Sequence, residues 1–151
     1  MKVLIIDDSN AKITALREVV FKSLNGSKVV VRRSFQKALQ EIERESYDIV
    51  LLDMTIPTTE RSDGRFEGRT RYFGGRELLG EMDLLDYDAK VVIVTQFDRF
   101  DDGVETIEFR DLMNKLEQEF QGLLIGTVFY TSISDRWVVE IEKILKDIQS
   151  Q

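Results

Sequence analysis

Acidic residues follow two apolar runs of the sequence. Asp7 and Asp8 come directly after KVLII, and Asp53 follows IVLL. Short runs of branched residues between helical patterns are typical of strands buried on both faces of a parallel sheet. Because the carboxyl ends of such strands meet at one edge, we expect the three carboxylates to lie together there. Like charges so placed favour a shared proton or a bound cation, and oxygen ligands favour Mg²⁺, with Mn²⁺ and Ca²⁺ less often.

The composition excludes several other kinds of site. The 151 residues include no cysteine and no histidine. Disulfides, thiolate sites, His-ligated zinc and Ser-His-Asp hydrolysis are therefore excluded. The net charge of −7 argues against nucleic-acid binding. No apolar run approaches the roughly 20 residues that span a bilayer, and the first residues are too acidic for a signal peptide, so we expect a cytoplasmic protein without membrane contact.

Strand and helix patterns alternate along the whole chain, which predicts one domain over residues 1–151. The predicted strands are Lys2–Asp7, Lys28–Arg32, Tyr47–Asp53, Lys90–Thr95 and Leu123–Tyr130. Each is followed by a helical pattern, with caps at Ser9 or Asn10, Ser34 and Ser134, a Gly74-Gly75 start for the third helix, and a long fourth helix from Val104 to about Phe120. Five strands alternating with five helices predict a parallel sheet covered on both faces.

Two polar segments interrupt this alternation. Residues 58–73 contain four arginines among acidic residues and glycines, with no visible period, and we interpret them as a long inserted loop. Gln96–Asp102 is interpreted as a second, shorter loop.

Four stretches in this order resemble the response-regulator receiver domain, the phosphoacceptor part of two-component signalling. They are VLIIDDS, LLDMTIP with proline four residues after Asp53, GGRELL at the third helix, and VVIVT ending in Thr95. The resemblance covers essentially the whole chain. It implies a flavodoxin-like, doubly wound five-stranded parallel sheet of order 2-1-3-4-5, with helices on both faces.

The resemblance also implies a role for each acid. Asp53 would accept the phosphoryl group, and Asp8 would bind Mg²⁺ together with Asp53 and the main-chain carbonyl of Thr55. Asp7 would act mainly through a metal-bound water. Phosphoryl transfer needs an in-line nucleophile and cations beside the phosphoryl oxygens, which these residue types supply. Thr95 would be the switch hydroxyl that turns towards the new phosphoryl group.

The end of the fifth strand departs from the family pattern. The family has a lysine there, usually followed by proline, whereas this chain has VFYTSIS. Thr131 is our choice for the lysine position, with Tyr130 and Ser132 as alternatives, and none of them is cationic. The aromatic switch position falls on Phe129, with Val128 as the alternative.

Two explanations of the missing lysine stay open. Either a loop arginine supplies the charge, with Arg71, Arg76 and Arg99 as candidates, or the domain is a degenerate receiver that binds partners without phosphorylation. The leading hypothesis is a phosphoacceptor that serves a histidine kinase or phosphotransfer protein and a downstream protein, as a monomer or homodimer. Its own chemistry would be at most Mg²⁺-dependent autophosphorylation from a phosphodonor and slow autodephosphorylation. A haloacid-dehalogenase-type phosphatase needs Asp-x-Asp, and the adjacent acids here disfavour it.

Overall fold

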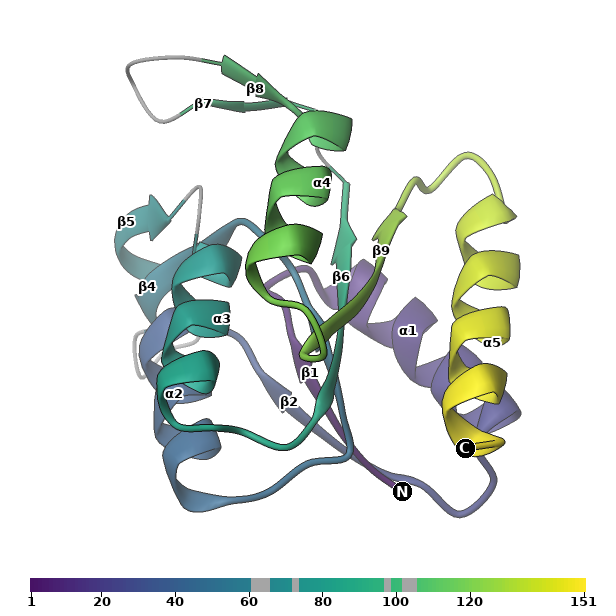
Figure 1. Cartoon of the computed structure of the whole chain (residues 1–151). Helices are drawn as coiled ribbons and strands as arrows, with labels where there is room; N and C mark the ends of the chain where they lie inside the picture. The colour runs from purple at the N-terminus through teal and green to yellow at the C-terminus, as the bar shows by residue number, and fades with distance from the viewer. Residues whose placement is uncertain (61–65, 72–73, 97–98, 102–105) are drawn as a thin grey trace.

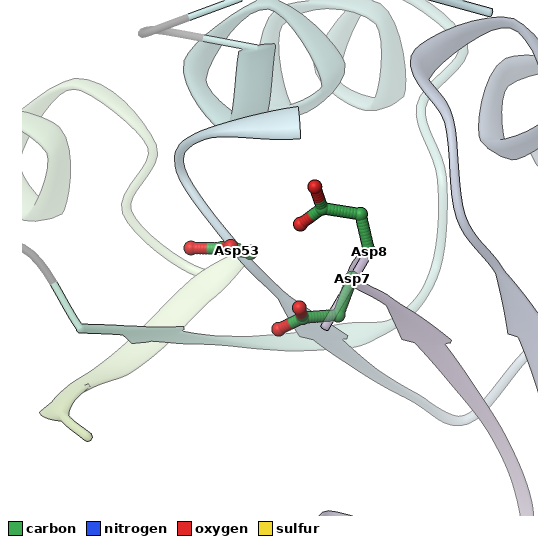
Figure 2. Close-up of side chains that lie close together, drawn as sticks. All are labelled: Asp7, Asp8 and Asp53. Carbon is green, nitrogen blue, oxygen red and sulfur yellow. The ribbon is translucent and has the colours of Figure 1, made fainter. Parts of the chain in front are cut away.

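Five parallel strands form the central sheet of the structure, a computed structural model that describes the chain except residues 61–65, 72–73, 97–98 and 102–105. The strands are β1 (Lys2–Ile6), β2 (Lys28–Arg32), β3 (Ile49–Leu52), β6 (Lys90–Thr95) and β9 (Leu124–Phe129). Their spatial order is β2-β1-β3-β6-β9 (Figure 1). Counted along the chain, this is the predicted order 2-1-3-4-5, and the flavodoxin-like fold is confirmed. The acids that follow β1 and β3 lie side by side at the carboxyl edge (Figure 2).

Helices cover both faces of this sheet, as the alternation predicted. One face packs against α1 (Asn10–Ser23) and α5 (Arg136–Gln149), and the other against α2 (Phe35–Arg44), α3 (Gly74–Leu84) and α4 (Phe109–Glu119). Figure 1 shows α1 and α5 together, away from the other three helices.

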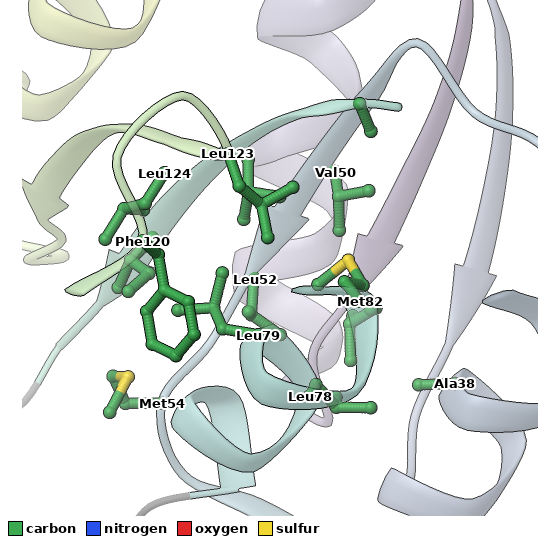
Figure 3. Close-up of a cluster of buried hydrophobic side chains, with 14 of the residues drawn as sticks. Ala38, Val50, Leu52, Met54, Leu78, Leu79, Met82, Phe120, Leu123 and Leu124 are labelled. Carbon is green, nitrogen blue, oxygen red and sulfur yellow. The ribbon is translucent and has the colours of Figure 1, made fainter. Parts of the chain in front are cut away.

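Strand β3 is the centre of the hydrophobic core. Its four residues are buried, and their side chains alternate between the two faces. Val50 and Leu52 join the cluster under α2, α3 and α4, whereas Ile49 and Leu51 join the cluster under α1 and α5. Figure 3 shows Leu52 beside Leu79 of α3. Burial on both faces explains why the strand is continuously apolar, and it holds the residue that follows the strand, Asp53, rigidly in place.

Serine caps start two helices as predicted. The hydroxyl of Ser9 accepts a hydrogen bond from the main-chain nitrogen of Lys12, and that of Ser34 accepts one from Lys37, both at 3.3 Å. The last helix begins slightly later than predicted. Asp135 precedes its first residue, while the Ser134 hydroxyl accepts from the main-chain nitrogen of Arg136 at 3.2 Å.

The two predicted loops are wrong in part, because each overlaps a short antiparallel hairpin. Strands β4 (Ile56–Glu60) and β5 (Phe66–Arg71) pair with each other at the first. In the second, β7 (Arg99–Asp101) pairs with β8 (Thr106–Glu108), which falls in the predicted fourth helix. These strands are short and largely polar, so no apolar period marks them. The fourth helix therefore begins at Phe109 and not at Val104, which lies outside the described residues. Within the described part of the chain, no helix is long and apolar enough to cross a membrane.

Candidate functional site

The ends of β1 and β3 bring the three predicted acids together. The main-chain nitrogen of Asp53 donates to the carbonyl of Ile6 at 3.0 Å, and that of Asp7 donates to the carbonyl of Arg32 at 3.1 Å. These bonds continue the strand pairing one residue past each strand. One carboxylate oxygen from each of Asp7, Asp8 and Asp53 lies within 4.8 Å of the other two. Figure 2 shows the three side chains around a common space.

The donor set of this cluster fits a hard divalent cation. Asp7 and Asp53 are buried and Asp8 is half-buried. One oxygen of Asp7 accepts a hydrogen bond from the main-chain nitrogen of Ser9 at 3.0 Å. The other oxygen of Asp7 and Oδ1 of Asp53 are buried and make no hydrogen bond of regular geometry with the described residues, although both face the ammonium of Lys12. Carboxylate oxygens are the ligands that Mg²⁺ prefers, and this cluster offers one from each of three acids.

Burial and crowding disfavour ionisation of Asp53 and Asp8 in the metal-free protein. Burial raises the pKa of Asp53 to about 6; Lys12 and Thr95 act to lower it, while Asp7 and Asp8 add to the rise. The pKa of Asp8 is also raised, first by burial and then by Asp7. A divalent ion would reverse this, because opposite charge favours the ionised carboxylates.

A lysine that the sequence analysis did not identify lies against the acids. Lys12 of α1 is only 1% exposed, and its Nζ is 2.7 Å from Asp7 Oδ2 and 3.5 Å from Asp53 Oδ1. The ammonium also donates to the carbonyl of Val94. One signal in the sequence pointed to it: Lys12 stands four residues before the inward-facing Leu16, on the buried side of the helix.

Comparisons with known proteins identify the family of this arrangement. A sequence model described as "Response regulator receiver domain" matches residues 3–115. The chain belongs to the response regulator receiver family.

Individual relatives of this receiver are distant. An uncharacterized protein, y4jR of Sinorhizobium fredii, is 24% identical over 145 residues, which cover 94% of this chain and 95% of the relative. The receiver domain of a LuxO repressor homologue from Vibrio parahaemolyticus superposes with a TM-score of 0.62 at 19% identity, covering 99% of this chain and 92% of that one. The response regulator TrrA of Thermotoga maritima, solved in complex with Mg²⁺ and BeF, has a TM-score of 0.61 at 19% identity, covering 95% and 97%.

The hydroxyl at the end of β6 lies close to Asp53. Thr95 is completely buried, and its presence lowers the pKa of Asp53. Its Oγ1 nevertheless makes no hydrogen bond of regular geometry with the described residues. Thr55 is half-buried, and the role of its carbonyl as a metal ligand stays a prediction.

The first turn of α3 packs directly against the main chain of Asp53 and Met54. The main-chain nitrogen of Gly75 donates to the carbonyl of Met54 at 3.0 Å. A Cβ on Gly75 would lie 2.7 Å from the carbonyl oxygen of Asp53, closer than real side chains come. Glycine is therefore required here by the approach of two backbones.

The end of β9 places aromatic rings on both faces of the sheet. Phe129 is 41% exposed and packs edge-on against Phe109 of α4, with ring centroids 5.8 Å apart. Val128 is buried on the other face. Tyr130 is also buried, with its ring 4.9 Å from that of Trp137 and 5.7 Å from Lys12 Nζ. Of the three positions considered for the missing lysine, Tyr130 is thus the one in contact with the cation of the site. Thr131 is half-buried and Ser132 is exposed.

The arginines considered as substitute cations are not shown at the acids. Arg76 is exposed and pairs with Glu119 of α4 at 3.2 Å, so in this structure its charge is neutralised elsewhere. The side chains of Arg71 and Arg99 lie outside the described residues.

Proposed function

We propose that this receiver accepts a phosphoryl group on Asp53 from a histidine kinase or phosphotransfer protein and passes the signal to a downstream protein. The observation that carries the proposal is the joint placement of Asp7, Asp8 and Asp53, whose oxygens lie within 4.8 Å of one another at the ends of adjacent strands. Membership of the receiver family supports the same role.

The side chains account for the transfer. A carboxylate oxygen of Asp53 attacks the phosphorus of the donor. The bond from phosphorus to the donor's imidazole nitrogen breaks, and that nitrogen keeps the electron pair and takes up a proton. With acetyl phosphate the broken bond is P–O and the leaving group is acetate. Little further chemistry is required of the protein beyond positioning and charge.

Mg²⁺ would be held by Asp8, Asp53 and the carbonyl of Thr55, with Asp7 acting through a metal-bound water. When bound, the ion neutralises charge on the phosphoryl oxygens. The TrrA structure with Mg²⁺ and BeF supports this choice of ion. Mn²⁺ has the same preference for oxygen ligands and is the alternative.

Phosphorylation would be communicated through the ends of β6 and β9. The buried Thr95 hydroxyl would turn towards a phosphoryl oxygen, since the new group brings charge and strong acceptors. The exposed ring of Phe129, packed on Phe109, is the aromatic element that could change position in response. Phosphorylation would change the populations of two arrangements of this surface, and a downstream protein would bind one arrangement more tightly than the other.

Acetyl phosphate and Mg²⁺ test the proposal directly. We expect the parent chain to gain the mass of one phosphoryl group and Asp53→Asn to gain none. Peptide mapping after borohydride reduction should place the modification on Asp53. A parent chain that gains no phosphoryl group and binds no fluoroberyllate would refute the proposal and favour the degenerate interaction module, whose partner complex would not respond to Asp53→Ala or Mg²⁺. The cytoplasmic location, the lack of nucleic-acid contact and the monomer or homodimer state stay predictions.

A further inference from the structure

The acids of this receiver are accompanied by a buried cation that enters from the first helix. We propose that Lys12 supplies the positive charge that the family pattern places at the end of the fifth strand, and that it pairs with the phosphoryl group on Asp53. The inference rests on the proposed function, because it names a further residue of the same site.

Burial makes the charge of Lys12 significant. A buried ammonium has lost its water and is stable only beside groups that replace it. Lys12 has carboxylates of Asp7 and Asp53 on one side and the carbonyl of Val94 as an acceptor. A lysine that served only to fill space would leave its head group in solvent, as long charged side chains usually do.

The environment at the end of β9 agrees with a relocated cation. Tyr130 stands in the stretch where the family pattern has lysine, and its ring faces Lys12 Nζ at 5.7 Å. An aromatic face beside an ammonium is a favourable arrangement. The chain thus combines a positive charge from α1 with an aromatic ring from β9 at the same acidic pocket.

The contacts of Lys12 also connect the acceptor to the switch strand. Val94, whose carbonyl accepts from Lys12, directly precedes Thr95. Lys12 is nearer to Asp7 than to Asp53 in this structure, at 2.7 Å against 3.5 Å. A phosphoryl group on Asp53 would offer stronger acceptor oxygens, and the ammonium would shift towards them. That shift would change the contact with the end of β6.

The variant Lys12→Met separates this role from a structural one, because the two ligands of the site should respond with opposite sign. Removing an ammonium that competes for Asp7 and Asp53 should tighten Mg²⁺ binding, on the order of tenfold. Fluoroberyllate, which mimics the phosphoryl group, should bind about 10- to 100-fold more weakly, as expected for loss of a charge-assisted hydrogen bond. Calorimetry measures the first and ¹⁹F NMR the second.

Two further variants control the experiment. Lys22→Met removes an exposed lysine of the same helix, whose nearest acid, Glu142, is 3.9 Å away, and it should change neither constant. The double variant Lys12→Met with Tyr130→Lys returns the cation to the fifth strand and should recover part of the fluoroberyllate affinity. Fluoroberyllate binding by Lys12→Met equal to that of the parent would overturn the inference while leaving the proposed function intact. Failure of the parent itself to bind would refute the proposed function.

A measurement on the unmodified chain covers the case in which Lys12→Met does not fold. In protein labelled with ¹⁵N at lysine Nζ, the buried ammonium should give a slowly exchanging signal. On addition of Mg²⁺ and fluoroberyllate, that signal should shift and show a contact to fluorine, and it should not do so in Asp53→Asn. An unchanged signal in a parent chain that has bound fluoroberyllate would overturn the inference.

Discussion

Replacing Asp53 by asparagine should stabilise the metal-free receiver at neutral pH. Burial holds the pKa of Asp53 at about 6, above the ordinary 3.8. The folded chain therefore binds more protons than the unfolded chain between these values, and stability falls as pH rises through that window. The difference of about 2 pKa units corresponds to about 3 kcal/mol of destabilisation, fully present above pH 6. Asparagine removes this destabilisation. The net gain is smaller by the stabilisation that Lys12 obtains from its ion pair with Asp53.

Urea unfolding with a chelator, followed through the single tryptophan, tests this at several pH values. The free energy of unfolding of the parent minus that of Asp53→Asn should become more negative from pH 4 to pH 7 by up to about 3 kcal/mol. Taking the difference removes contributions from other acids. Asp88→Asn replaces an exposed acid and is the control. The free energy of unfolding of the parent minus that of Asp88→Asn should not change with pH. The reasoning is refuted if Asp53→Asn is less stable than the parent at pH 7 or if the difference does not depend on pH.

Three further variants test separate parts of the structure. Gly75→Ala should lower the free energy of unfolding in urea by about 1–3 kcal/mol, because the new Cβ meets the main chain at Asp53. Gly80→Ala on the same helix meets nothing and should raise it by about 0.5–1 kcal/mol. Equal effects of the two variants would contradict the close approach. Burial acts to raise the pKa of Glu41, but the Tyr47 hydroxyl and two arginines outweigh it and hold the pKa below its usual value. The stability that ionised Glu41 contributes is present above pH 4.5 and is lost as pH falls. Tyr47→Phe should therefore lower the free energy of unfolding by about 1–3 kcal/mol at pH 7 and by less at pH 4. A loss that is the same at both pH values would argue against this dependence on the ionisation of Glu41. Thr95→Val should change stability only slightly, since its Oγ1 makes no regular hydrogen bond with the described residues and only favours the ionised form of Asp53. It should weaken fluoroberyllate binding measured by ¹⁹F NMR; unchanged binding would remove the switch role.

The sequence was most informative where burial is strongest. A strand such as β3, covered on both faces, must be apolar throughout. Ile49–Leu52 could therefore be recognised from its own residues, without knowing which strands pair with it. The acids that follow such strands could be placed at one edge for the same reason. The hairpins β4–β5 and β7–β8 were missed because their strands are short and mostly polar, and their pairing depends on partners that a periodicity analysis does not see.

Lys12 shows a different limit of sequence reasoning. A lysine near the start of a helix is ordinarily solvated, and charge alone gave no reason to place it inside. Its position on the inward stripe was visible in the spacing to Leu16, but only the fold shows that this stripe ends at the acids. The search for a substitute cation was therefore directed to loop arginines, of which Arg76 pairs with Glu119 instead.

Both hairpins begin at the edge of the sheet where Asp53 lies. Strand β4 starts at Ile56, shortly after β3 ends, and β7 starts at Arg99, shortly after β6 ends, so each insertion leaves the carboxyl edge of the sheet. If Asp53 is the phosphoacceptor, a protein phosphodonor would approach it at the edge from which both hairpins leave. We expect the fit of an upstream protein to the hairpins β4–β5 and β7–β8 to determine which phosphodonor proteins the chain accepts. The three acids themselves would not distinguish between phosphodonors.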